Sequence, residues 1–223
     1  MKRLWDKFLV QKYTQLLLIL ILIFLGFSIS NAAISEITLS VLVVTAIILV
    51  IRTFYIHERL YKLYMAIAFL AFVADGFEIY LSTVHPINIP LGLTTNLVHL
   101  MFFGLAVALI AQQIFLGQVV TLDTIVGGIC LFLLIGDIWF LMYHSLYLIN
   151  SDAFNYGNNQ LEPFDLLYFS FTTLTTVGYG DLSPLSPLAN AATNLEGIIG
   201  VLYPAIFIGR LVGAYQPISA KRS

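Results

Sequence analysis

Residues 175–181 read TTVGYGD, a pattern in which two glycines alternate with larger residues. Gly178 and Gly180 can adopt backbone angles that are closed to other residues. Because they alternate with Val177 and Tyr179, successive carbonyl oxygens can point the same way, which neither a helix nor a regular strand allows. A row of aligned carbonyl oxygens can take the place of the water around a cation. The pattern therefore predicts a cation site built from main-chain oxygens.

The chain that must position this segment is strongly apolar. Of its 223 residues, 60% are hydrophobic and 10% are charged, against about 25% charged in an ordinary soluble domain. This composition indicates a membrane protein. The net charge of −2 and the lack of any basic block argue against nucleic acid as a partner. Cys130 is the single cysteine, which excludes an internal disulfide bond.

Apolar stretches suited to crossing a bilayer as helices are expected at six places: residues 15–31, 37–51, 63–84, 91–116, 124–148 and 188–212. Every Lys and Arg lies before the first stretch, between the second and third, or from the end of the sixth onward. Since Lys and Arg concentrate on the cytoplasmic side, we expect both termini in the cytoplasm. A cleaved secretory signal is the alternative interpretation of the first stretch. We favour a retained helix.

The segment before TTVGYGD differs from these spans. Pro163 fits the first turn of a helix, and Asp165 beside it favours the positive N-terminal end. Only about three helical turns fit before residue 175, so this helix must enter the membrane and return. Non-helical backbone at that depth is tolerated only where it is buried in protein or lines a water-filled cavity.

Together with this half-helix, TTVGYGD closely resembles the selectivity filter of potassium channels, in which loops from four chains replace the hydration shell of the ion. The resemblance implies K+ as the permeant ion, no organic cofactor, and ion sites formed by the carbonyls of Thr176, Val177, Gly178 and Tyr179, with Gly180 completing the ion-binding segment. It implies support of the filter by Thr175, Asp181, Tyr168 and Phe169, the last two packing against Tyr179. One loop per chain implies a homotetramer.

The whole chain resembles the six-span layout of voltage-gated-like cation channels in the plasma membrane. This implies an all-α membrane protein, surrounded by lipid, with four parts: a cytoplasmic interfacial N-terminus (1–14), a four-helix peripheral domain (15–118), a pore domain (122–213) and a short cytoplasmic tail (214–223). The pore domain comprises an outer helix, a re-entrant pore helix, the filter and an inner helix. The stretch at 91–116 departs from the family because it contains no Lys or Arg. Voltage sensors need such charges, so arginine-based voltage gating is not expected.

The sixth stretch resembles the inner helix of the same family. Gly200 stands where many members have a hinge glycine, and Pro204 removes the helical hydrogen bond to the Gly200 carbonyl. We therefore expect a hinge or a fixed kink at this turn. Candidate pore-lining and gate residues follow at helical spacing: Val201, Ala205, Ile208 and Val212.

Four acidic residues lie within the apolar stretches: Asp75, Glu78, Asp137 and Glu196. Intramembrane carboxyl groups are costly and indicate function by default. Two interpretations stay open. In the first, which we favour, each is protonated or hydrogen-bonded to a neighbouring helix. In the second, they sense protons.

The favoured function is a potassium-selective channel, which is not an enzyme. A proton-coupled transporter or membrane enzyme built on Asp75, Glu78 and Asp137 is an alternative. It lacks the repeated discontinuous helices of many transporters and any nucleophile with a base. A nonselective cation channel is the third hypothesis, and the intact VGYGD with Tyr179 argues against it.

Overall fold

The computed structural model describes residues 12–29, 89–117, 120–157 and 161–214, together with isolated positions between 62 and 76. Helices dominate these ranges. The elements are α2 (Lys12–Ile29), α5 (Ile89–Leu116), α6 (Leu122–Ile149), the 3-10 helix η1 (Ser151–Ala153), strand β1 (Phe154–Asn155), α7 (Pro163–Leu174), strand β2 (Ser183–Pro184) and α8 (Pro187–Ala214).

Within the described part of the chain, α5, α6 and α8 have 28 residues each and are long and apolar enough to cross a membrane. They confirm the long apolar helices predicted at 91–116, 124–148 and 188–212. Helix α2 coincides with the first predicted stretch. The stretch at 37–51 and most of that at 63–84, which holds Asp75 and Glu78, lie outside the described residues. The same is true of most of the predicted interfacial N-terminus and of the cytoplasmic tail.

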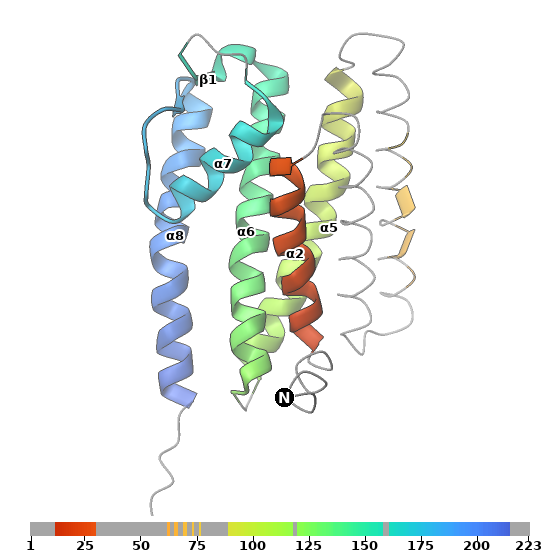
Figure 1. Cartoon of the computed structure of the whole chain (residues 1–223), viewed down its shortest axis with the longest axis vertical. Coiled ribbons are helices and arrows are strands. Elements are labelled where there is room, and N and C mark those ends of the chain that lie inside the picture. The colour runs from red at the N-terminus through yellow and green to blue at the C-terminus, as the bar shows by residue number, and fades with distance from the viewer. Residues whose placement is uncertain are drawn as a thin grey trace, which may run out of the picture.

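Helix α6 is the central element of the described chain. Helices α2 and α5 pack against it on one side, and α7 and α8 pack against it on the other (Figure 1). Helix α7 is short and lies obliquely between α6 and α8, near the end of the molecule that carries β1. The residues predicted to form a pore domain, 122–213, comprise α6, α7 and α8 with their connections.

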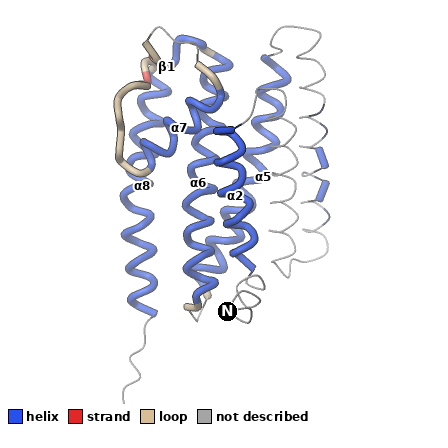
Figure 2. Tube along the Cα trace, viewed as in Figure 1, coloured by secondary structure: helices blue, strands red, loops and turns tan. Residues whose placement is uncertain are grey.

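A short pairing between β1 and β2 closes this end of the molecule. The strands are antiparallel, with Phe154 opposite Pro184 and Asn155 opposite Ser183. They are the small stretch of sheet in an otherwise helical trace (Figure 2). The pairing joins the segment after α6 to the segment after residue 181. It is an exception to the predicted all-α class, and strands of two residues are too short to show a sequence pattern.

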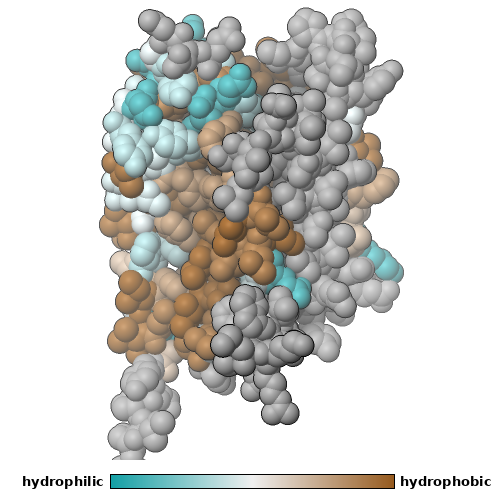
Figure 3. Space-filling model, viewed as in Figure 1, coloured by the Kyte–Doolittle hydropathy of each residue, from teal (hydrophilic) through white to brown (hydrophobic). Residues whose placement is uncertain are grey.

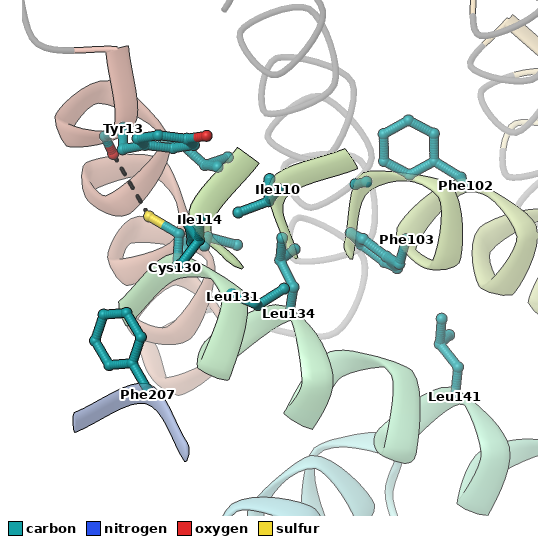
Figure 4. Packing of buried hydrophobic residues seen from close by; sticks show 13 residues of the cluster. Tyr13, Phe102, Phe103, Ile110, Ile114, Cys130, Leu131, Leu134, Leu141 and Phe207 are labelled. Atoms are coloured by element: carbon teal, nitrogen blue, oxygen red, sulfur yellow. Dashed lines mark hydrogen bonds between the residues drawn. The ribbon is translucent and has the colours of Figure 1, made fainter. Parts of the chain in front are cut away.

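Small residues bring the helices close together in the main apolar core. The ring of Tyr13 on α2 covers Gly127, and the ring of Phe207 on α8 covers Gly128. The Cys130 thiol donates to the carbonyl of Tyr13 (Figure 4). The rest of the core comes from α5 and α6, including Phe102, Ile110 and Leu134. A second buried cluster, around Tyr143, Phe154 and Phe169, supports α7.

The surface follows the same division. Hydrophilic residues gather at the end that carries β1 and α7, and apolar residues cover the described helices below it (Figure 3). This distribution suits a chain whose helices lie in a bilayer and whose connections near α7 meet water.

Candidate functional site

Helix α7 begins and ends as its sequence suggests. Pro163 occupies its first turn, where a missing amide hydrogen costs nothing. The main-chain amide of Glu162 donates to the Asp165 carboxylate over 2.9 Å, which fixes the helix start. The helix is 12 residues long and ends at Leu174, directly before TTVGYGD. A helix of this length is too short to span a bilayer.

In the backbone after α7, residues with positive and negative φ angles alternate. The φ angle is positive at Thr176 (60°), Gly178 (51°) and Gly180 (80°) and not at Val177 or Tyr179. Thr176 is the one non-glycine residue with positive φ in the described chain. Such a conformation costs roughly 1–3 kcal/mol and persists where the surroundings enforce it. Alternation of this kind is what a row of similarly directed carbonyl oxygens requires.

The amide groups of this segment turn back toward α7. The amides of Val177 and Gly178 both donate to the Thr172 carbonyl, over 2.8 and 3.1 Å, and the Thr176 amide donates to Thr173 over 2.9 Å. The Thr175 hydroxyl donates to the Phe171 carbonyl over 2.6 Å. Carbonyls of α7 therefore hold the amides of the first four residues of the segment, 175–178. Among the described residues, no hydrogen bond is donated to the carbonyl oxygens of the segment.

Residues 175–181 are exposed along their whole length in the single chain. Val177 is 53% exposed and Tyr179 is 71% exposed. Exposed apolar and aromatic side chains are a surface that another chain or lipid can cover.

Tyr168 contacts the C-terminal end of the segment at two residues. Its ring stacks on that of Tyr179, with 6.1 Å between centroids and 6° between planes. Its hydroxyl donates to the Asp181 carboxylate over 3.0 Å. Nearby, the Asp165 carboxylate raises the pKa of the Tyr156 phenol, as expected where acidic groups gather.

The placement of Phe169 corrects one expectation. The sequence reasoning paired both Tyr168 and Phe169 with Tyr179. In the structure, Phe169 is buried and packs against Tyr143 and Phe154 instead, with centroid distances of 5.1 and 5.7 Å. Neighbouring helical residues point about 100° apart, so the two aromatic rings cannot share one contact.

Glu196 lies behind α7, in a set of polar contacts that the sequence did not indicate. Its side chain is 0% exposed. The Tyr143 hydroxyl on α6 donates to one carboxyl oxygen, and the Ser170 hydroxyl on α7 lies 2.6 Å from the other. The favoured interpretation of this acid, a hydrogen-bonded group, is the one that these contacts support. Asp137 on α6 is also buried, but no hydrogen bond joins it to the described residues.

Gly200 packs against the end of α7. A Cβ atom placed on it would collide with the Leu174 carbonyl. A close approach of two backbones therefore requires glycine here, whatever its part in bending. Pro204 lies inside the continuous helix α8.

The four candidate pore-lining residues of α8, Val201, Ala205, Ile208 and Val212, are all exposed in the single chain. On another face of the same helix, Phe207 packs against Gly128 of α6. Sequence reasoning missed Arg210 in this region. Its guanidinium donates to the carbonyls of Phe115 and Gly117, where α5 ends.

Comparisons with known proteins find similarity in the part of the chain that contains α7 and residues 175–181. Residues 129–216 match a family model described as an ion channel. A segment of 42 residues is 45% identical to the inward rectifier potassium channel Kirbac3.1 of Paramagnetospirillum magnetotacticum. This segment covers 19% of the present chain and 14% of that channel. No solved structure matches the chain. The matches are thus partial: one part of the chain is similar to an ion channel family, and a short segment is similar to a potassium channel.

Proposed function

We propose that the chain is a potassium-selective channel, in which four copies bring residues 175–181 together around one pore. The alternating backbone at residues 176–180 carries this proposal. It supplies the similarly directed carbonyls, and the exposed Val177 and Tyr179 supply the surface that neighbouring copies would cover. The ion channel match over residues 129–216 supports the same conclusion.

In this proposal, the carbonyls of Thr176, Val177, Gly178 and Tyr179 replace the hydration shell of K+ as it passes. Four oxygens from each level of the filter compensate the lost water, so K+ moves passively along its gradient. The Thr176 hydroxyl completes the innermost site. Helix α7 directs the negative end of its dipole toward the cavity below, which favours a cation there.

The proposed gate is independent of an arginine voltage sensor. Helix α5 takes the place of the sensor span, and its residues 89–116 include no Lys or Arg. Without such charges the membrane potential does little work on the helix. We place the gate in the exposed inner part of α8, where Ile208 and Val212 are 58% and 68% exposed in the chain. Apolar rings of this kind close a pore by excluding water.

Flux from liposomes tests the selectivity. The purified full chain is reconstituted under a K+ gradient, and the same measurement is made with Na+. We expect K+ flux in the wild type and its loss in Gly178→Ala, because φ is 51° there and a side chain strains this conformation.

Gly157 offers a matched control for this variant. It has a φ of 61°, and an added Cβ meets nothing within 4 Å, as at Gly178. Both alanine variants therefore carry similar backbone strain, but only Gly178 lies in the proposed filter. Gly157→Ala should conduct like the wild type. Wild-type K+ flux and preference in Gly178→Ala would contradict the proposal.

The number of copies is tested separately. Native mass spectrometry of the purified protein should show a tetramer, because a filter needs four loops and each chain supplies one. Selective K+ flux from a preparation that contains only monomers or dimers would overturn this part of the proposal.

A further inference from the structure

A buried junction behind α7 joins the three helices of the pore region. Glu196 of α8, Ser170 of α7 and Tyr143 of α6 are all 0% exposed. Ser170 and Glu196 are 26 positions apart in the sequence, and Tyr143 and Glu196 are 53 apart. None of the three belongs to the proposed filter. Their hydrogen bonds nevertheless define how α7 sits between its neighbours.

The hydrogens of this junction can be counted. The Ser170 hydroxyl oxygen lies 2.6 Å from Glu196 Oε1 and 2.9 Å from the carbonyl oxygen of Gly136. A hydroxyl group has a single hydrogen to donate, and a carbonyl oxygen only accepts. If Ser170 donates to Gly136, the contact between Ser170 and Glu196 needs a hydrogen from Glu196.

A neutral Glu196 satisfies every contact. The Tyr143 hydroxyl donates to Oε2, Oε1–H donates to Ser170, and Ser170 donates to the Gly136 carbonyl. An ionised Glu196 would instead take the hydrogen of Ser170, leaving the Ser170 and Gly136 oxygens facing each other as two acceptors. It would also leave a buried charge, which is costly without a cation beside it.

No cation in the described chain compensates Glu196. Its hydrogen-bond partners are the hydroxyls of Tyr143 and Ser170. The other titratable or charged groups on the packed helices make no hydrogen bond or ion pair with it: on α6, Asp123, Cys130, Asp137, His144 and Tyr147; on α7, Asp165 and Tyr168; on α8, Tyr203 and Arg210. The hydroxyl network is therefore the whole polar environment that the described residues give to this acid.

We propose that Glu196 remains protonated and acts as a positioning residue, its neutral carboxyl group linking α6, α7 and α8 so that α7 holds the filter in its conducting geometry. The protonated link itself does not depend on the proposed channel function. Only its effect on the filter rests on that proposal. The link to the filter is short. Ser170 is two residues before Thr172, whose carbonyl accepts from both Val177 and Gly178. Displacement of α7 would therefore displace the filter backbone.

Two substitutions at one position separate the polar link from simple space filling. Gln in Glu196→Gln has a carbonyl that can accept from Tyr143 and an amide that can donate to Ser170. Met in Glu196→Met fills similar space without either group. We expect K+ flux and K+ preference over Na+ within twofold of the wild type in Glu196→Gln and a loss of at least tenfold in Glu196→Met. Equal behaviour of the two variants would overturn the positioning role.

The pH profile provides a second readout. Because the link needs the proton, flux should fall as the pH rises and Glu196 ionises. Glu196→Gln has no proton to lose and should abolish this fall. Asp137→Asn, which changes another buried acid on α6, is the matched control and should retain it. An alkaline fall of the same size in Glu196→Gln would contradict the inference.

Infrared spectroscopy tests the protonation state without any flux. The wild-type spectrum minus that of Glu196→Gln, recorded at neutral pH, should contain the carbonyl band of a protonated carboxylic acid. A carboxylate band alone would overturn the inference. A protein that has the acid band but conducts no K+ would contradict the proposed channel and leave the protonated link intact, so the two failures are distinct.

Discussion

The two halves of α8 are held in different ways. In residues 187–200, Ala189, Ala192, Glu196 and Gly200 are buried within the chain. In residues 201–214, Phe207 is the buried residue of the helix, and Val201, Ile206, Ile208 and Val212 are each more than half exposed. The second half is thus held by fewer buried residues of its own chain. Exposed apolar side chains occur in both halves, since Leu188, Leu195 and Ile198 of the first half are also more than half exposed.

The contacts of the two halves also differ in kind. The first half, residues 187–200, is called the outer half here, and residues 201–214 are called the inner half. The outer half meets α7 through the Glu196 junction and through Gly200, whose backbone lies against that of Leu174. The inner half is tied at side-chain ends, by Tyr203 to Gly128 and by Arg210 to the end of α5. Backbone contacts allow less adjustment than the ends of long side chains. We therefore expect the outer half to preserve the filter and the inner half to move.

The largest effect should come from Gly200→Ala. The added methyl group would collide with the carbonyl of Leu174, which is backbone and cannot rotate away. Overpacking of this kind costs typically 1–3 kcal/mol, and we expect K+ flux to fall at least tenfold with reduced thermal stability. Gly197→Ala is the control, because an added Cβ there meets nothing within 4 Å of the chain. Wild-type flux in Gly200→Ala would contradict the claim that the outer half of α8 preserves the filter through its contact with α7.

A smaller effect is expected when polar residues enter the inner half. Ile208→Ser or Val212→Ser should let water into the proposed constriction. Open probability should rise about tenfold, which corresponds to ~1.4 kcal/mol, with unchanged preference for K+ over Na+. Single-channel recording measures both quantities. Ile206→Ser is the control, since Ile206 is similarly exposed but lies outside the candidate pore-lining set. An unchanged open probability in both variants would place the gate elsewhere, such as in the filter.

The unusual backbone of residues 176–180 and the long helices could be predicted because their signals are local. The spacing of Gly178 and Gly180 prescribes the backbone by itself, and the apolar length of α5, α6 and α8 is read directly from composition. The Glu196 junction could not be predicted in this way. Ser170 and Tyr143 stand in apolar helices far from Glu196 in the sequence. Which polar groups meet depends on helix rotation and packing, which hydropathy does not encode.

Helix rotation and packing also explain the other differences between the sequence-based expectations and the structure. Tyr168 and Phe169 are adjacent aromatic residues, and only the orientation of α7 decides that the first faces Tyr179 while the second is buried. Gly200 was predicted to be part of a hinge or kink. Its contact with Leu174 depends on how α7 and α8 pack together, which the sequence does not specify. Arg210 was interpreted only as a cytoplasmic charge, because nothing in its neighbourhood indicates the end of α5.

Arg210→Gln should have an intermediate effect that is confined to gating. The guanidinium donates to the carbonyls of Phe115 and Gly117, and this side chain is partly exposed. Hydrogen bonds from a charged group contribute up to about 1.5–3 kcal/mol, and less where water competes. We expect open probability to change about threefold with constant K+ preference. Arg210→Lys keeps the charge and should change it less. Loss of selectivity in Arg210→Gln would show that the inner half also controls the filter.

The smallest effect should follow from Tyr203→Phe, and its comparison with Tyr143→Phe is the sharpest test of the two halves. Tyr203 donates to the Gly128 carbonyl over 2.7 Å, while its ring contacts with Phe132 and Phe207 do not need the hydroxyl. Its removal should lower stability by about 1 kcal/mol and leave flux and selectivity within twofold.

Tyr143→Phe removes the same atom from a residue of α6 that contacts the outer half of α8, and it leaves the fully buried Glu196 without one of its donors. A buried polar group that loses its partner costs roughly 1–3 kcal/mol, so this variant should unfold at a lower temperature than Tyr203→Phe. It should also lose K+ preference, because α7 is no longer tied to α6 through Glu196. Thermal unfolding in detergent and paired K+ and Na+ flux measure both effects. If the two variants lose stability and selectivity equally, the halves of α8 are held alike, and the different roles assigned to them are wrong.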